Sequence, residues 1–316
     1  MAEAGDERIE LAARLLKAGG LVAFPTETVY GLGADASNAA AMARLYAVKG
    51  RPGDHPVIVH FADANAAFGW ASEVPDAAHR LAAKFWPGPL TLVLKRAPHV
   101  GDCVTGGQDT VGVRVPVHPL ALEVIAAFGG GVAAPSANRF GRVSPTTAQH
   151  VHADLGTDVD LVVDGGPCGV GIESTIVEVS RGTPVLLRPG GISRAELEAA
   201  LGSPVALPDA EAPRVSGSLA AHYAPRTPAR LVSSEALEAE IARLGPTAGV
   251  LAFSAPDDRV DFWLRMPRDP AAYAQKLYAA LRELDSTGCA LLLIESPPAV
   301  PEWQAVLDRL RRAARD

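Results

Sequence analysis

Short apolar runs and amphipathic stretches alternate along most of the chain up to residue 201, with Gly and Pro residues between them. Apolar runs that end at Pro or Gly are typical of buried strands, and the stretches between them have helical periodicity. This irregular alternation predicts a mixed sheet that is covered by helices. The predicted strands are residues 21–24, 56–61, 90–95, 112–115, 132–134, 161–163, 174–179 and 185–188. The predicted helices are residues 8–18, 38–48, 76–86, 119–128, 145–155 and 194–201.

A Pro-rich stretch interrupts the pattern after residue 202. Its prolines suit an extended connector better than a packed element. They are Pro204, Pro208, Pro213, Pro225 and Pro228. We therefore place one domain at residues 1–202, a linker at residues 203–228 and a smaller α/β domain at residues 229–316.

The stretch after the linker alternates strands and helices. The predicted strands are residues 229–232, 248–253 and 290–294, and the predicted helices are residues 235–244, 271–284 and 302–311. Strands that are joined in this way form a small, parallel, Rossmann-like sheet. No Gly-x-Gly-x-x-Gly turn follows the first of these strands, so the pattern does not support a second nucleotide site.

Composition narrows the functional classes. Of the 316 residues 48% are hydrophobic, and 36 acidic against 29 basic side chains give a net charge of −7, which argues against a broad grip on nucleic acid. No apolar run approaches the roughly 20 residues that a membrane span needs, and the acidic start does not resemble a signal segment. We therefore expect no membrane association and a cytoplasmic location. The scattered Cys103, Cys168 and Cys289 predict neither a zinc site nor a disulfide framework.

The first predicted strand leads into a polar loop. Residues 24–33 read FPTETVYGLG, so hydroxyl groups and one carboxylate follow the strand, and two glycines let a ligand approach the backbone. Asn38 is a plausible N-cap of the next predicted helix, and Gly50 and Pro52 stop it. This leaves Lys49 and Arg51 beside the loop, and two cations at this spacing suit phosphate oxygens. A solvated cation pair at a helix end is the alternative. His55 and His60 flank the strand that comes next.

Further polar residues stand at predicted strand and helix ends. Valines alternate with Arg114, so this arginine projects from the opposite face of its strand if the valines are buried, and there it can hold a carboxylate. Ser144 before a proline reads as a helix N-cap, and the start of that helix could receive phosphate. Ser136 and Arg188 stand at strand ends beside Pro. An ordinary surface or turn role is the alternative for each of them.

Taken in order, these motifs resemble the threonylcarbamoyl-AMP synthase family in its two-domain form. They are FPTETVYGLG (24–33), KGRP (49–52), PVIVH (56–60), WPGPLT (86–91), VGVRVP (111–116), APSAN (134–138), ESTI (173–176), LRPG (187–190) and HYAP (222–225). The resemblance implies the family's twisted, open sheet with a concave ligand face, followed by a small accessory domain. Relatives usually carry Pro-Gly where this chain has SGS (216–218), and the position of His55 varies among them.

The resemblance implies a nucleotidyltransferase. Its reaction makes L-threonylcarbamoyladenylate and pyrophosphate from L-threonine, bicarbonate or CO2, and ATP, as the first step toward N6-threonylcarbamoyladenosine at position 37 of tRNA. Mg²⁺ would arrive with ATP, and no metal ligand among the protein side chains is predicted. The product would pass to a tRNA threonylcarbamoyl transferase complex, with weak or indirect contact to tRNA itself.

The resemblance also implies the residues of the site. The implied threonine contacts are Thr28, His60, Arg114, the Ala134 backbone and Ser174. The implied ATP contacts are Arg51, His55, Thr110, Ser136, Asn138, Ser144, Arg188 and Tyr223. Lys49 and Arg51 are the expected catalytic cations, and His60 is a candidate for the general base.

Two other functional classes stay open. An RNA-binding module could use the concave face of the same fold, although the acidic balance does not favour it. A carbamoyl-transfer enzyme could share the first domain. Such enzymes, as in hydrogenase maturation, carry acylphosphatase and Cys-x-x-Cys zinc modules that this sequence does not contain.

Overall fold

The computed structural model describes residues 2–217 and 222–314, with side chains from residue 7 onward. The chain divides into two compact units. The first comprises Met1–Phe140, Pro145–Gly169 and Glu173–Ser218, and the second comprises Gly141–Ser144, Val170–Ile172 and Leu219–Asp316. Residues 218–221 of the predicted linker lie outside the described residues, and the predicted bounds of linker and domains stay predictions.

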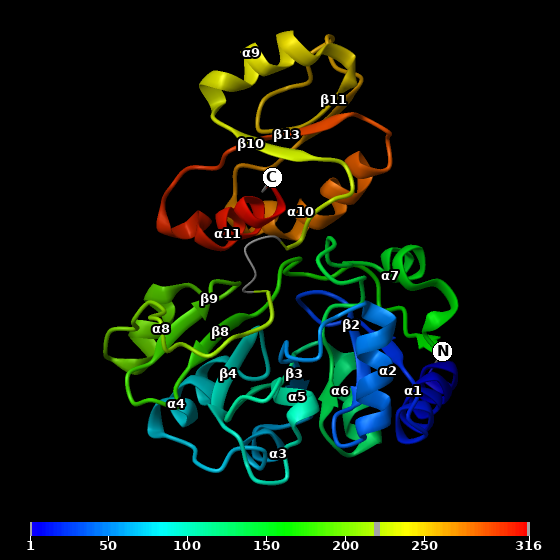
Figure 1. The fold of residues 1–316 in the computed structure, drawn as a ribbon, viewed down its shortest axis with the longest axis vertical. Coiled ribbons are helices and arrows are strands. Elements are labelled where there is room, and N and C mark those ends of the chain that lie inside the picture. Colours follow the sequence, from blue (N-terminus) through cyan, green and yellow to red (C-terminus); the bar gives the residue numbers. More distant parts are fainter. Residues whose placement is uncertain (1, 218–221, 315–316) are drawn as a thin grey trace. The chain divides into compact units, whose positions relative to one another are not determined.

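A mixed sheet forms the centre of the first unit (Figure 1). Its described strands lie in the order β7-β1-β2-β6-β3-β5-β4-β8-β9. β3, β5 and β9 run in one direction, and β4 and β8, which lie between β5 and β9, run in the other. The strands are β1 (Val22–Phe24), β2 (Gly31–Asp35), β3 (Ile58–His60), β4 (Leu90–Lys95), β5 (Thr110–Arg114), β6 (Val132–Ala133), β7 (Leu161–Val162), β8 (Thr175–Glu178) and β9 (Val185–Arg188).

Helices cover both faces of this sheet near β1. Val22 and Phe24 share a buried apolar cluster with α1 and α6, whereas Ala23 belongs to a larger cluster that includes Met42 and Leu45 of α2. Because alternate residues of a strand point to opposite faces, β1 is packed on both sides. The described helices of the unit are α1 (Ala2–Lys17), α2 (Ala39–Lys49), α3 (Ala64–Phe68), α4 (Asp76–Phe85), α5 (Asp102–Thr105), α6 (Pro119–Phe128), α7 (Ala148–Leu155) and α8 (Arg194–Leu201).

The predicted mixed α/β fold is confirmed, and the differences are local. The sequence pattern does not indicate α3, α5 or β2, whose sequence GLGAD reads as a loop although it is paired on both sides. The predicted start of α7 is wrong, because the helix begins behind Thr147, whose hydroxyl accepts a hydrogen bond from the backbone of His150 (3.3 Å). Pro145 instead uses its carbonyl to accept from the backbone N–H of Tyr30 (2.9 Å). Ser144 is therefore not an N-cap.

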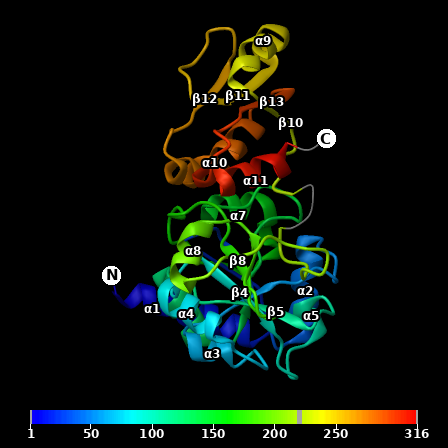
Figure 2. The same ribbon diagram turned by 90° about the vertical axis from the view of Figure 1, so that its left-hand side faces the viewer.

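The second unit contains a parallel sheet in the order β10-β13-β11-β12, as Figures 1 and 2 show. α9 covers one face, and α10 and α11 cover the other. The parallel arrangement is confirmed, but the pattern misses β12, which follows β11 without a helix between them. The elements are β10 (Ala229–Val232), α9 (Ser234–Leu244), β11 (Ala248–Ala252), β12 (Phe262–Arg265), α10 (Pro270–Asp285), β13 (Leu291–Glu295) and α11 (Gln304–Ala313). Among the described helices of the chain, none has the length and apolar character that crossing a membrane requires.

Candidate functional site

One edge of the first sheet collects polar side chains that the sequence singles out. His60, Arg114 and Arg188 are the last residues of β3, β5 and β9, which run in the same direction. Thr91 and Ser174 stand at or next to the beginning of β4 and β8, which run the opposite way. The ends of five neighbouring strands thus bring these five residues to one edge, which we call the polar edge.

Strand alternation explains why Arg114 faces the site. Val111 and Val113 belong to the main apolar core together with Leu92 of the neighbouring strand. Gly112 and Arg114 therefore face the other side of the sheet. The predicted division between valines and arginine is confirmed. Arg114 is only 3% exposed, so it is not an ordinary surface arginine.

Arg114 is held by hydrogen bonds from three of its nitrogens. Nη2 donates to Glu27 Oε1 (2.5 Å), Nη1 to Thr28 Oγ1 (3.0 Å) and Nε to the carbonyl of Gly88 (3.3 Å). A guanidinium has five N–H donors. Among the described residues, one donor on each terminal nitrogen has no acceptor, and two such donors are what a bidentate carboxylate engages.

His60 lies beside Arg114, because the two residues are register partners on the parallel strands β3 and β5. Its ring is buried, and its Nδ1 has no hydrogen-bond partner among the described residues. Burial, reinforced by the charge of Arg114, lowers the pKa of His60 to about 3. The imidazole is therefore uncharged at neutral pH. A group with so low a pKa is a poor acceptor for the proton of an ammonium group, which argues against His60 as the general base.

Arg188 fixes the far end of the polar edge. Its Nε and Nη2 donate to the carbonyl of Ser174 at 3.1 and 2.9 Å, and Nη2 also reaches the Ser174 hydroxyl at 3.1 Å. That hydroxyl in turn pairs with the Thr91 hydroxyl at 2.8 Å. Ser174 is thereby oriented from two strands.

The two ends of α2 set the positions of Lys49 and Arg51. Asn38 caps the start of the helix with its side-chain oxygen, and Gly50 ends it in the left-handed conformation (φ 63°), which glycine adopts at low cost. The turn at Gly50 leaves Lys49 buried against the body of the unit and sends Arg51 beyond the helix. A helix with these caps is what the sequence predicts.

Lys49 ties α2 to the turn of the APSAN motif. Its Nζ donates to the carbonyls of Ser136 (2.5 Å) and Asn138 (2.6 Å). Burial, with the nearby charge of Arg51, lowers the pKa of this lysine. The Lys-x-Arg and Ser-x-Asn motifs therefore meet in space. Lys49 thus stabilises this turn through two hydrogen bonds, and its catalytic role stays a prediction.

Arg51 and Arg188 converge on one residue. Arg51 Nη2 donates to the carbonyl of Pro56 (2.7 Å) and to the hydroxyl of Ser216 (3.1 Å), and its guanidinium lies 5.4 Å from the ring centre of Phe140. Arg188 Nη1 donates to the carbonyl of the same Ser216 (2.8 Å). Two guanidinium groups that meet in this way match an anion with several oxygens, such as a polyphosphate.

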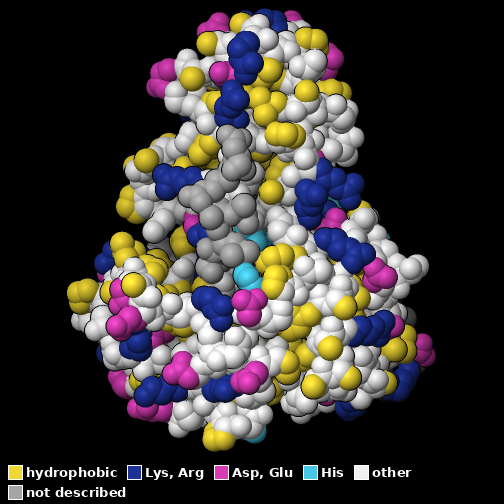
Figure 3. Space-filling view, viewed as in Figure 1, with side chains coloured by type: hydrophobic (Ala, Val, Ile, Leu, Met, Phe, Trp, Pro, Cys, Tyr) yellow, Lys and Arg dark blue, Asp and Glu magenta, His cyan; other side chains and the backbone are white. Residues whose placement is uncertain are grey.

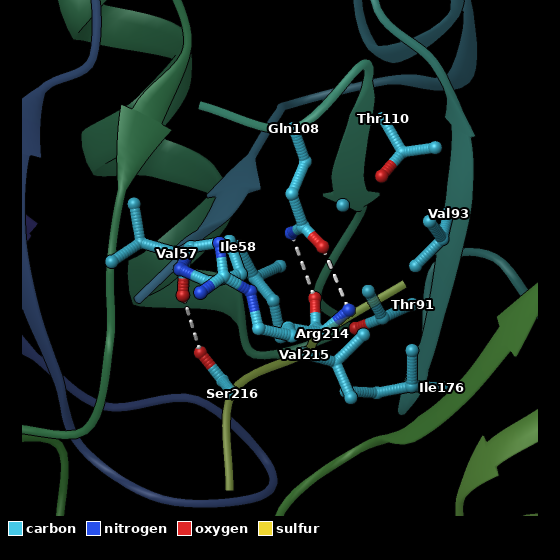
Figure 4. A pocket seen from close by; sticks show the side chains of 12 residues that line it. Val57, Ile58, Thr91, Val93, Gln108, Thr110, Ile176, Arg214, Val215 and Ser216 are labelled. Atoms are coloured by element: carbon cyan, nitrogen blue, oxygen red, sulfur yellow. Dashed lines mark hydrogen bonds between the residues drawn. The ribbon is translucent and has the colours of Figure 1, made fainter. Parts of the chain in front are cut away.

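Residues 214–216 cross this face of the sheet (Figure 4). Gln108 holds the segment through both ends of its amide, which donates to the carbonyl of Arg214 (3.0 Å) and accepts from its N–H (2.7 Å). Arg214 adds an ion pair to Asp54 (3.3 Å). On the other side of Val215, Ser216 is held by Arg51 and Arg188, so the segment is anchored at both ends.

A small pocket lies beneath this segment. Val215 packs on Val93 and Ile176, and Thr110 lines the same pocket (Figure 4). The free volume is about 20 Å³, which is room for about one water molecule. Thr110 is therefore on the ligand face of the sheet, as its predicted ATP contact requires.

The predicted residues of the first unit fall into two groups. The polar edge and the loop beside it bring together Thr28, His60, Arg114, Ser174 and Arg188. The end of α2 and the turn it holds bring together Lys49, Arg51, His55, Ser136 and Asn138. The backbone of Ala134 is a predicted threonine contact, and its N–H donates to the Ile58 carbonyl (3.1 Å). The His55 ring packs edge-on against Phe140, with 5.3 Å between ring centres.

Ser144 and Tyr223 belong to the second unit and are described within it. Tyr223 is buried and has a left-handed backbone (φ 60°), with Tyr278 stacked 5.8 Å away and the Arg309 guanidinium 5.1 Å from its ring centre. The carbonyl of Ser144 accepts from Arg282 Nε (3.4 Å). The ATP contacts of Ser144 and Tyr223 stay predictions.

The second unit also has a cavity of about 520 Å³ between α9 and the loop after β11. Its charged lining consists of Glu238, Asp257, Asp258 and Arg259, and Arg259 donates to Asp257 at 2.6 Å. An excess of carboxylates disfavours phosphate groups. This cavity therefore does not change the expectation that the nucleotide site lies elsewhere.

Comparison with known proteins identifies the family of the chain. The family model described as "Telomere recombination" matches residues 14–190, and the model described as "Threonylcarbamoyl-AMP synthase, C-terminal domain" matches residues 192–315. The threonylcarbamoyl-AMP synthase of Pyrococcus abyssi is 39% identical over 321 residues, covering 97% of this chain and 94% of that protein. The chain belongs to the threonylcarbamoyl-AMP synthase family. It is therefore an enzyme of this family, as the sequence predicts.

Other relatives support the family assignment. The Bacillus subtilis threonylcarbamoyl-AMP synthase is 41% identical over 324 residues, covering 98% of this chain and 93% of that protein. The crystal structure of P. abyssi Sua5 complexed with L-threonine has a TM-score of 0.91 at 37% identity, and the match covers 98% of this chain and 94% of that one. The predicted two-domain form of the synthase family is confirmed.

The sequence alone does not specify the contacts of several site residues of this family member. Glu27 was visible only as one carboxylate in a polar loop, and its arginine partner is 87 residues away. Gln108 binds a segment 106 residues away. Thr91 stands in an apolar strand, where a single hydroxyl is ordinary. Such contacts depend on strand order, which a single sequence does not specify.

The low pKa of His60 predicts how the stability of this synthase responds to acid. Between about pH 6.5 and 3 the unfolded chain binds a proton at His60 that the folded chain does not, so stability falls as the pH drops. The unfolding free energy of the wild type should therefore fall more steeply than that of His60→Gln, by up to about 1.4 kcal/mol per pH unit. Urea unfolding between about pH 7 and 4.5 measures both slopes.

The control is His99→Gln, which changes an exposed histidine and should leave the slope of the wild type unaltered. Equal slopes for the wild type and His60→Gln would mean that His60 is protonated as easily in the folded chain as in the unfolded chain.

Proposed function

We propose that this family member catalyses the adenylyl transfer that joins L-threonine, bicarbonate or CO2, and ATP into L-threonylcarbamoyladenylate, with release of pyrophosphate. One observation carries the proposal. On a single face of the first sheet, Arg114 of β5 has two N–H donors available, and β4 and β8 separate it from Arg188 of β9. Arg188 and Arg51 converge on Ser216. A carboxylate anchor and a polyphosphate anchor thus share one surface.

The threonine end of the site would be built on Arg114. Its two available donors would hold the substrate carboxylate, and the neighbouring Thr28, His60 and Ser174 offer hydroxyl and imidazole partners for the substrate hydroxyl. P. abyssi Sua5, which shares the fold at a TM-score of 0.91, has been crystallised with L-threonine. That relative supports threonine as the substrate here.

The nucleotide end would use Arg51 and Arg188, with Thr110, Ser136 and Asn138 near them. Within the described residues, no group of three or more His, Cys, Asp or Glu side chains could hold a metal ion. A Mg²⁺ ion would be held mainly by the triphosphate and water, where it would neutralise phosphate charge. Ser144 and Tyr223 are proposed ATP contacts on the strength of the family resemblance alone.

The chemistry needs positioning rather than a protein nucleophile. The uncharged threonine amine adds to CO2, and a carbamate oxygen then attacks the α-phosphorus opposite the leaving pyrophosphate. Alignment of two bound reactants can contribute about 7–11 kcal/mol to lowering the barrier. Guanidinium groups at the phosphates would stabilise the charge that develops there.

The alternative classes have less support. The relatives are named as synthases and not as RNA-binding modules or carbamoyl-transfer enzymes. On the face drawn in Figure 3, Asp and Glu side chains of the first unit lie among its Lys and Arg side chains. A nucleic-acid surface usually gathers basic groups on one face. The transfer of product to a tRNA-modifying complex and a cytoplasmic location stay predictions from the sequence.

Pyrophosphate release tests the proposed reaction. It should require L-threonine, bicarbonate and ATP together, because the carbamate must form before it can attack the nucleotide. An assay in which each component is omitted in turn measures this requirement. Release that persists without threonine, or no release with the complete mixture, would contradict the proposal.

Arg51→Lys tests the polyphosphate anchor. Lysine keeps the charge but cannot reach two acceptors in a fixed fork. Pyrophosphate release should fall by about 10²- to 10³-fold, the usual loss for one preorganised donor. The matched control is Arg44→Lys, which alters an arginine bound to Asp160 at the surface (2.6 and 2.9 Å) and should leave turnover unchanged. Near-normal release by Arg51→Lys would remove Arg51 from the site.

A further inference from the structure

Glu27 is a buried carboxylate in the loop after β1, and it is not among the site residues that the family resemblance implies. One of its oxygens accepts from Arg114 Nη2 at 2.5 Å, and the other accepts from the backbone N–H of Val117 at 3.2 Å. The side chain is 11% exposed, and that of Arg114 is 4% exposed. Glu27 is therefore fixed at both oxygens against the residue that would hold the substrate carboxylate.

Three titratable groups that interact with Arg114 or Glu27 carry no charge at neutral pH. Burial and the charge of Arg114 lower the pKa of His60 to about 3. Burial raises the pKa of the Cys168 thiol to about 12, with Glu27 adding to the effect. Burial also lowers the pKa of His118, which interacts with Glu27 as well. In the cluster formed by Arg114, Glu27 and these three groups, the charges of Arg114 and Glu27 cancel.

A neutral cluster has a consequence for the ligand. An amino acid with a free carboxylate and an ammonium group is also neutral, so its binding leaves the buried region without net charge. A monoanion of the same shape would leave one uncompensated negative charge, which is costly where solvent cannot screen it. Without Glu27 the preference would reverse, because Arg114 alone would favour an anion.

We propose that Glu27 is a specificity-determining residue, which cancels the charge of Arg114 beside the substrate carboxylate and so selects the zwitterionic amino acid over an anion of equal shape. The inference rests on the proposed function, because it needs the substrate carboxylate on Arg114. This selection by charge would act in addition to the proposed hydrogen bonds to the threonine hydroxyl.

Two ligands of matched shape test the proposal. One is L-threonine, and the other is 2,3-dihydroxybutanoate of the same configuration, in which a hydroxyl replaces the ammonium group. Dissociation constants for both are measured by calorimetry with the wild type and with Glu27→Gln, which keeps the side-chain shape and removes the charge. In Glu27→Gln threonine should bind about tenfold more weakly and the hydroxy acid more tightly, so the selectivity ratio falls by at least about tenfold.

The controls separate charge from shape. Glu27→Asp keeps the charge, so the selectivity ratio should persist even if both ligands bind more weakly. Glu178→Gln alters a fully buried glutamate that pairs with Arg181 at 3.0 Å, and it should change neither dissociation constant. A uniform loss for both ligands in Glu27→Gln would show that Glu27 only holds Arg114 in place and would overturn the proposal.

The wild type alone gives a second test if Glu27→Gln does not fold. It should prefer threonine to the hydroxy acid by at least about tenfold, and a ratio near one would overturn the proposal. The proposed function fails separately if threonine does not bind the wild type, or if Arg114→Ala binds threonine as tightly. In either case the role of Glu27 falls with it.

Discussion

A buried ion pair joins Arg114 at the end of β5 to Glu27 in the loop after β1. A guanidinium cannot be buried alone at acceptable cost, and removing one partner of such a pair costs about 3–5 kcal/mol. Glu27 therefore compensates the buried charge of Arg114 and fixes the orientation of its guanidinium group. Thr28 and the carbonyl of Gly88 take two further donors, and among the described residues one donor on each terminal nitrogen stays without an acceptor.

The second set of cations is held differently. In the contacts described above, Lys49, Arg51 and Arg188 donate to backbone carbonyls and hydroxyls, which fix direction without cancelling charge. In the proposed site, one end pairs Arg114 with Glu27 and would suit a zwitterion, and the other end is positive and would suit a polyphosphate. The charges of the two ends then match those of the two substrates, because threonine is neutral overall and ATP carries several negative charges.

Local sequence signals predict the elements that position the site. Contacts between residues far apart in the sequence depend on strand pairing and cannot be predicted in this way. The caps Asn38 and Gly50 fix α2, and alternating valines fix the direction of Arg114, so these were within reach of the sequence. The pairing of Arg114 with Glu27 could not be predicted, because the two residues are 87 positions apart and only the strand order brings them together. The start of α7 was misplaced for a related reason, since the carbonyl of Pro145 serves a loop bond to Tyr30 rather than a helix.

The central claim is that one sheet face holds both substrates at separate anchors. A crystal structure with L-threonine and a non-hydrolysable ATP analogue tests it most directly. The account predicts the threonine carboxylate on the two available donors of Arg114, with the bond to Glu27 kept, and the triphosphate oxygens on Arg51 and Arg188. Threonine bound away from Arg114, or phosphates that contact neither of the other two arginines, would contradict it.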